Sequence, residues 1–252
     1  MIDEVEDPRN FNGGPIFYVS DLVEPTLELQ DLEHLALSRR LRSKEEILLS
    51  DGKGTVRSGL VTIDSRHKSR LKGEISELGP VFKLDPPEPK VRVVSYMPRG
   101  ERLSFMVEKV AEVGVDELFL VSSPLDRRSG HPIGSATLAR LERVARQASM
   151  QSKRVFPLSI GGVLSPHEVI NRFGDDAALC DQRGGLPSLE RKTWIIGPES
   201  GVVDALFDEV PRIRVGSEVL RVETASVVSA ALLVALRDNL LVSSDISLQK
   251  RD

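Results

Sequence analysis

Residues 194–201 read Trp-Ile-Ile-Gly-Pro-Glu-Ser-Gly, a short apolar run followed at once by a turn that holds two glycines. The apolar run has the length and composition of a buried β-strand. Glycines at both ends of the turn let the backbone bend sharply and approach a ligand closely. The stretch therefore predicts a strand that opens into a loop. It matches neither a Walker loop nor a dinucleotide fingerprint, and a Gly-Pro turn is often only a turn.

Strands and helices alternate on both sides of this stretch. Strands are expected at 91–97, 118–121, 177–180, 194–196 and 213–215, and helices at 103–113, 137–151, from the capping box at 165–168, and at 225–240. In the first helix, one apolar face consists of Leu103, Met106, Val107, Val110 and Ala111. This alternation predicts an α/β domain with a parallel sheet, and such sheets bind ligands beyond the carboxyl ends of their strands. The apolar last helix is expected to be buried on more than one side, as in a dimer interface.

The N-terminal part has a different rhythm. Residues 1–14 show no periodicity and are expected to form a flexible leader. Strands are expected at 16–19, 45–49, 55–63 and 70–78, with a hairpin turn at 51–54 and one short helix at 32–41. Residues 15–85 thus predict a small β-barrel, separated by the proline-rich linker at 85–89 from a second domain over 86–252.

Composition excludes several classes of protein. The chain has 252 residues, one cysteine (Cys180) and four histidines without a close cluster, so an internal disulfide and a zinc site are not expected. No run of about 18 apolar residues is present, and the first residues are acidic rather than basic and apolar. The sequence therefore predicts a soluble, cytoplasmic protein that holds no metal.

The formal charge of -4 is unevenly distributed. Residues 1–33 hold nine acids and one base, whereas 39–72 hold ten bases against four acids and 127–154 hold seven against one. Charge runs of this kind are usually solvated faces, but two basic segments also fit a nucleic-acid partner that the average charge hides.

Five stretches stand in the order and spacing of motifs from one protein family. They are 34–42 with Asp51-Gly52, then 108–115, 145–157, 194–201 and 219–225, the last reading Leu-Arg-Val-Glu-Thr-Ala from 220. In these stretches the chain resembles the RsmE-type 16S ribosomal RNA uracil-N3 methyltransferases, a branch of the SPOUT superfamily, over about residues 15–240. Ser200 departs from the second glycine of the family's Gly-Gly, and Gly13 to Tyr18 stand where members often begin with an arginine before two aromatics.

The resemblance implies a PUA-like N-terminal barrel that binds RNA and a SPOUT α/β domain whose chain is threaded into a trefoil knot. It also implies a homodimer, S-adenosyl-L-methionine as methyl donor, and a uridine of 16S rRNA in the small ribosomal subunit as acceptor. The residues expected to bind the cofactor lie in the two loops of the knot: Ile196, Gly197, Pro198, Glu199, Gly201, Val215, Gly216, Val219, Leu220, Thr224 and Ala225.

Methylation of uracil N3 requires removal of the proton that this nitrogen carries. We expect Arg221 to orient the nucleotide or offset charge on its oxygen, and Glu223 or Glu199 to orient it and assist removal of the proton. In the simpler alternative, these residues have structural roles only. Thr224 would cap the last helix, and the negative charge of Glu223 would stabilise the positive N-terminal end of that helix. An Arg221/Glu223 pair would then only fix the loop.

The basic segments provide the residues expected to bind RNA: Arg39, Arg40, Arg42, Arg66, Lys68 and Arg70 on the barrel, and Arg140, Arg143, Gln147 and Arg154 on the second domain. Two other functions fit the same sequence. One is a SPOUT methyltransferase that acts on another RNA, and the other is a non-catalytic RNA-binding or ribosome-assembly protein on the same fold.

Overall fold

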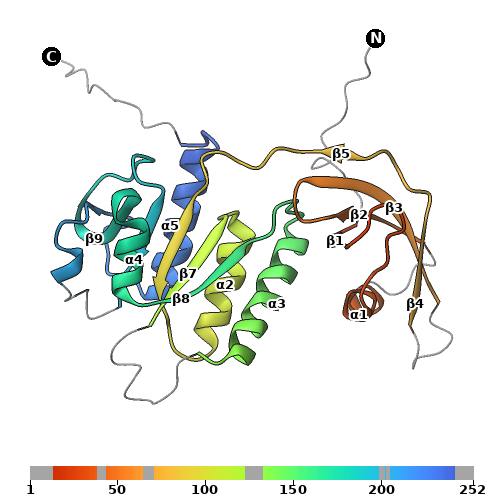
Figure 1. Cartoon of the computed structure of the whole chain (residues 1–252), viewed down its shortest axis with the longest axis horizontal. Helices are drawn as coiled ribbons and strands as arrows, with labels where there is room; N and C mark the ends of the chain where they lie inside the picture. Colours follow the sequence, from red (N-terminus) through yellow and green to blue (C-terminus); the bar gives the residue numbers. More distant parts are fainter. Residues whose placement is uncertain are drawn as a thin grey trace, which may run out of the picture. The chain divides into compact units, whose positions relative to one another are not determined.

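The computed structural model describes residues 14–38, 44–64, 71–122, 133–198, 202 and 205–241. The chain forms two compact units, Met1–Pro87 with Ala145–Pro157, and Glu88–Val144 with Leu158–Asp252 (Figure 1). Except for Gly14, the predicted leader lies outside the described residues. No helix among the described residues has the length and apolar character needed to cross a membrane.

The first unit is built on a mixed sheet of five strands in the order β1-β2-β3-β4, with β5 also paired to β3. These strands are β1 (Ile16–Tyr18), β2 (Glu45–Ser50), β3 (Thr55–Asp64), β4 (Lys72–Ser76) and β5 (Phe82–Lys83). The predicted hairpin is confirmed, because β2 and β3 are antiparallel and the Asp51 carboxylate accepts the backbone N–H groups of Lys53 and Thr55 at 2.7 and 3.0 Å. Closure of this sheet into a barrel stays a prediction.

Helix α1 (Leu29–Ser38) begins three residues before the predicted start. It begins there because the Glu28 carbonyl already accepts the N–H groups of Asp31 and Leu32. The Asp31 side chain is buried, and both of its oxygens accept N–H groups of Arg146, at 2.9 and 2.8 Å. Arg146 lies near the end of α3 (Ser135–Gln151), in the part of that helix that belongs to this unit. The buried Asp31 side chain thereby has a cationic partner within an otherwise apolar core.

The second unit contains a six-stranded sheet in the order β11-β9-β10-β6-β7-β8, in which every neighbouring pair is parallel. The strands are β6 (Arg92–Tyr96), β7 (Glu117–Val121), β8 (Ser159–Leu164), β9 (Ala177–Gly185), β10 (Thr193–Ile196) and β11 (Arg212–Ile213). The predicted parallel α/β sheet is confirmed. Because all strands point the same way, their carboxyl ends meet at one edge of the sheet.

Helices cover both faces of this sheet. Helices α2 (Glu101–Val113) and α5 (Val222–Arg237) pack together on one face, where the hydroxyls of Ser95 on β6 and Ser226 on α5 are 2.9 Å apart. On the other face, α4 (Pro166–Phe173) and the short η4 (Ala205–Phe207) complete an apolar cluster with Val94 and Phe119. The turn η3 (Gly174–Asp176) follows α4, whose predicted capping box is confirmed.

In the second unit, strand β8 and the start of helix α5 differ from the sequence-based prediction. Strand β8 was not predicted, because its centre is Gly161-Gly162, and a side chain at 161 would collide with the Phe119 ring. Helix α5 begins at Val222 rather than at residue 225, since burial of Val222 and Glu223 fixes its first turn. Its N-cap is Arg221, which makes no side-chain capping bond, so the interpretation of Thr224 as the N-cap is wrong.

Candidate functional site

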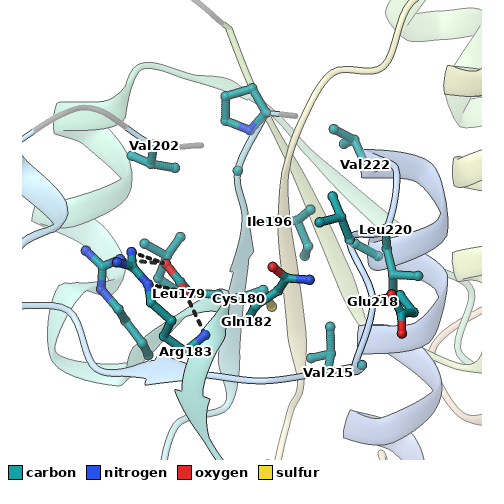
Figure 2. A pocket seen from close by; sticks show the side chains of 17 residues that line it. Leu179, Cys180, Gln182, Arg183, Ile196, Val202, Val215, Glu218, Leu220 and Val222 are labelled. Carbon is teal, nitrogen blue, oxygen red and sulfur yellow. Dashed lines mark hydrogen bonds and ion pairs between the residues drawn. The ribbon is translucent and has the colours of Figure 1, made fainter. Parts of the chain in front are cut away.

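A cavity of about 560 Å³ opens at the carboxyl edge of the parallel sheet (Figure 2). Its walls come from the end of β9, the end of β10 with the following turn, the chain from β11 to α5, and the first turn of α5. These segments are far apart in the sequence and meet because β9 lies between β10 and β11 in the sheet. The cavity has the size and the mixed apolar and polar lining of a small-molecule site.

Most of the residues predicted to bind a cofactor line this one cavity. They are Ile196, Gly197, Pro198, Val215, Gly216, Val219, Leu220 and Ala225. Glu199 and Gly201 lie outside the described residues, as does Ser200. Thr224 does not line this cavity and lines a neighbouring one instead. The loop after β10 and the loop before α5 therefore line the same cavity.

The glycine at position 197 is required by close packing. A Cβ atom added there would lie 2.6 Å from a methyl carbon of Val202, which is closer than real side chains approach. The equivalent distance at Gly216 is 3.5 Å, to Leu220, which is an ordinary contact. The lack of a side chain at position 197 thus lets Val202, which also lines the cavity, pack against the end of β10.

The opposite side of the cavity is polar, and the sequence-based prediction missed it. The Asp181 carboxylate forms ion pairs with Arg183 at 3.3 Å and with Arg212 at 2.7 Å, as the dashed lines in Figure 2 show. Hydrogen bonds from Arg183 lower the pKa of Asp181 to about 2, and Arg212 adds to this effect. Gln182 and Glu218 also line this region. Charged residues directly after a buried strand were the signal that could have indicated it.

Cys180 lies between the apolar and polar sides of the cavity. Its sulfur is 3.4 Å from the Ser229 hydroxyl on α5, and burial raises the pKa of the thiol to about 12. A thiol with such a pKa is protonated at neutral pH, and the thiolate is the nucleophilic form. Cys180 is therefore part of the wall rather than a nucleophile.

A second cavity, of about 620 Å³, lies between the start of α2 and the start of α5. It is lined by Glu101, Arg102, Phe105, Val219, Leu220, Arg221, Glu223 and Thr224. Val219 and Leu220 line both cavities, so this dipeptide forms a shared wall between them. The two described residues that we expected to be catalytic, Arg221 and Glu223, both line the second cavity.

Glu223 is the least solvated charged group of this second cavity. Its side chain is 9% exposed, and Oε1 lies 3.7 Å from Nε of Arg102, which is half exposed. Its other oxygen, Oε2, is buried and has no hydrogen-bond partner. The alternative that Glu223 pairs with Arg221 is wrong, since the ion pair is made with Arg102 on α2.

The residues predicted to bind RNA fall into two groups. Arg39, Arg40, Arg42, Arg66, Lys68 and Arg70 lie outside the described residues. Arg140, Arg143 and Gln147 are exposed on α3, whereas Arg154 is half-buried three residues beyond the end of that helix, with its carbonyl accepting the Tyr18 hydroxyl. Arg154 therefore does not continue the helical face on which it was predicted. Among the described residues no group of three or more His, Cys, Asp or Glu side chains could hold a metal ion.

The chain is similar to known proteins in sequence and in fold. The chain is similar to ribosomal RNA small subunit methyltransferase E of Mycobacterium bovis, with 26% identity over 78% of this chain and 80% of the relative. Its fold is similar to that of a "probable rRNA-methyltransferase" from Porphyromonas gingivalis, with a TM-score of 0.71, 20% identity, and coverage of 90% of this chain and all of the other. It is also similar to ribosomal RNA small subunit methyltransferase E from Neisseria gonorrhoeae bound to S-adenosyl methionine, with a TM-score of 0.66, 21% identity, and coverage of 88% and 97%.

The family model described as an RNA methyltransferase domain matches residues 86–234, which is more than half of the chain. The matched range contains all the described residues of both cavities and every strand of the parallel sheet. The chain therefore belongs to the RNA methyltransferase domain family.

Proposed function

We propose that this protein transfers a methyl group from S-adenosyl-L-methionine to N3 of a uridine in 16S rRNA of the small ribosomal subunit. The observation that carries the proposal is the pair of adjoining cavities with a shared wall at Val219 and Leu220. A methyl transfer needs a donor and an acceptor held close together, and the shared lining residues bring the two cavities side by side.

The first cavity fits the methyl donor. Its apolar and glycine-bearing side suits an adenosine, and Gly197 lets the chain after β10 pack closely at the edge of the cavity. On its polar side, Asp181 and Arg183 supply opposite charges for the ammonium and carboxylate of an amino acid. When bound, S-adenosyl-L-methionine would supply an electrophilic methyl group on a sulfonium.

The second cavity then holds the groups that act on the acceptor. Arg221 orients the nucleotide or offsets charge on its oxygen, and Glu223 orients it and assists removal of the N3 proton. Glu199, which lies outside the described residues, is the other proposed carboxylate. N3 is on the base-pairing edge of uracil, so the base must be unpaired before these groups reach it.

The remaining features of the proposal concern the whole protein. We propose that the first unit is a PUA-like RNA-binding barrel, that the second unit has a SPOUT trefoil knot, and that the protein is a homodimer through this unit. RNA contacts would come from the basic segments at 39–72 and 127–154, and such binding should weaken steeply with salt because it releases counterions. The exposed Arg140 and Arg143 on α3 support this role.

The test has two parts. Calorimetry should show binding of S-adenosyl-L-methionine, whereas a non-catalytic RNA-binding protein would show none. Mass mapping of nucleosides in rRNA from strains with and without the gene should show one N3-methyluridine in 16S rRNA that depends on this gene. A methylated site in another RNA, with an unchanged 16S rRNA, would favour the alternative acceptor.

An Arg221→Ala variant tests the catalytic assignment. We expect it to lose turnover while it keeps the cofactor affinity of the wild type, because Arg221 lines only the second cavity. Wild-type turnover in this variant would exclude the role.

A further inference from the structure

The second cavity contains an aromatic side chain that the proposed mechanism has not used. Phe105 lies on α2 and is 49% exposed, although its neighbours Leu103, Met106 and Val107 are buried in the core. Among the aromatic side chains of the described residues, it is the one that is about half exposed. A flat apolar ring at the wall of a cavity is suited to stack on a nucleobase, because every nucleobase has a π-face.

The same cavity presents hydrogen-bonding groups that match one base edge. The pairing edge of uracil offers an N–H donor at N3 between two carbonyl acceptors, whereas cytosine has an acceptor at N3. Glu223 supplies an acceptor with one buried oxygen that lacks a partner, and Arg221 supplies donors. A buried acceptor without a partner is costly, and a ligand N–H would remove that cost.

Arg102 restrains the Glu223 carboxylate. Its Nε lies 3.7 Å from Oε1 of Glu223, and Arg102 belongs to the same turn of α2 as Phe105. This ion pair holds Oε1 near the start of α2 and so limits the positions that the second oxygen can take. The start of α2 thus brings to this cavity both a stacking surface and the group that positions the acceptor.

We infer that the second cavity is the pocket for the acceptor base, in which Phe105 stacks on a uracil ring, Glu223 accepts the N3–H, and Arg102 positions Glu223. This inference rests on the proposed function and names residues beyond it. In the reaction, the N3 proton passes to the Glu223 carboxylate. The N3 electron pair then forms the new N–C bond, while the electron pair of the broken C–S bond stays on the donor sulfur. Cytosine has no N3–H to give and would be rejected.

Substitutions in the full-length protein test each part of the pocket. Phe105→Leu removes the ring and keeps an apolar side chain, and it should raise KM for small-subunit rRNA about tenfold or more. Phe105→Trp keeps a stacking ring and should stay within about threefold of the wild type. Arg102→Gln should lower kcat about tenfold with a smaller change in KM, and Arg102→Lys should restore most of it. Arg99→Gln, an equal charge change at an exposed position outside the cavity, should have little effect.

Photocrosslinking gives a readout that does not depend on turnover. Transcribed 16S rRNA with 5-iodouridine in place of uridine should crosslink to the tryptic peptide at 103–109, whose one aromatic residue is Phe105. The crosslink should disappear in Phe105→Leu. Calorimetry with S-adenosyl-L-methionine serves as the folding control, and all variants should bind it within about twofold of the wild type.

The outcomes separate this inference from the proposed function. If the wild type binds no S-adenosyl-L-methionine or does not methylate small-subunit rRNA, the proposed function fails. If the wild type methylates and Phe105→Leu and Arg102→Gln match it in kcat and KM, only the base pocket is overturned. It is also overturned if these variants turn a dimer into a monomer by light scattering, because a second copy of the chain would then cover the cavity.

Discussion

Substitution of Gly197 by alanine is the most direct test of the cavity at the end of β10. The new Cβ atom would lie 2.6 Å from Cγ2 of Val202, and the next nearest atoms of Val202 are its N at 3.6 Å and its Cβ at 3.8 Å. The collision is therefore with one methyl group. To reach an ordinary contact of 3.4 Å or more, that methyl group or the turn after β10 must move by about 1 Å.

The size of the effect follows from how stiff Val202 is. Its branched Cβ restricts rotation about χ1, and an off-rotamer side chain costs about 0.5–1.5 kcal/mol. Overpacking of a tight site costs about 1–3 kcal/mol in total. Val202 itself lines the cavity, so displacement of its side chain or of the turn changes the shape of the site. We expect Gly197→Ala to lose about 1–3 kcal/mol of folding stability and at least about tenfold in cofactor affinity, the latter equal to about 1.4 kcal/mol.

Urea unfolding and calorimetry with S-adenosyl-L-methionine measure the two effects. Gly216→Ala is the matched control in the other loop, where the new Cβ would lie 3.5 Å from Leu220, and it should change stability by less than about 0.5 kcal/mol. The double variant Gly197→Ala/Val202→Ala removes the colliding methyl groups and should recover most of the lost affinity. Wild-type affinity in Gly197→Ala, or no recovery in the double variant, would refute this account of the cavity.

Three further predictions concern other parts of the structure. Arg146→Met should destabilise the first unit by about 3–5 kcal/mol in urea unfolding, because it leaves the Asp31 carboxylate buried without its cation, and Arg146→Lys should lose less. Cys180 should resist alkylation by iodoacetamide at pH 8 in the folded protein and react rapidly in urea, since burial raises its pKa to about 12; equal rates would contradict this. The Asp181 pKa is lowered to about 2, so its pairing with Arg183 stabilises the fold above about pH 4 and is lost as the pH falls towards about 2. Calorimetric melting should accordingly show Asp181→Asn less stable than the wild type near neutral pH, with a gap that narrows below about pH 4.

The carboxyl edge of the predicted parallel sheet indicated both glycine-bearing loops, and the family resemblance assigned them to one cofactor. The structure brings eight of these residues to one cavity, whereas their binding of a cofactor stays a prediction. The loops converge because parallel strands share a carboxyl edge, whatever the order of the strands.

The polar side of the same cavity depends on strand order, which the sequence does not reveal. Asp181 and Arg212 meet because β11 pairs with β9 rather than with β10, its predecessor along the chain. Strands β9, β10 and β11 were each predicted, but nothing in their local composition specifies this neighbour. The length of β9 was also underestimated, because Asp181 to Gly185 continue the strand with residues that are uncommon in strands.

Helix α2 was predicted correctly, but the prediction did not recognise Phe105 as a possible functional residue. The predicted apolar face, from Leu103 to Ala111, is the buried face in the structure. Phe105 is apolar as well but lies off that face. Because only one side of the helix packs against the core, the half-exposed Phe105 ring adds little hydrophobic stabilisation to the fold. Its exposure has no explanation within the fold of the second unit, whereas a stacking partner in the adjacent cavity would supply one. In α2, the apolar residues that recur with the helical period form the buried core face. Phe105, the large apolar residue outside that period, lines the second cavity and indicates a binding surface.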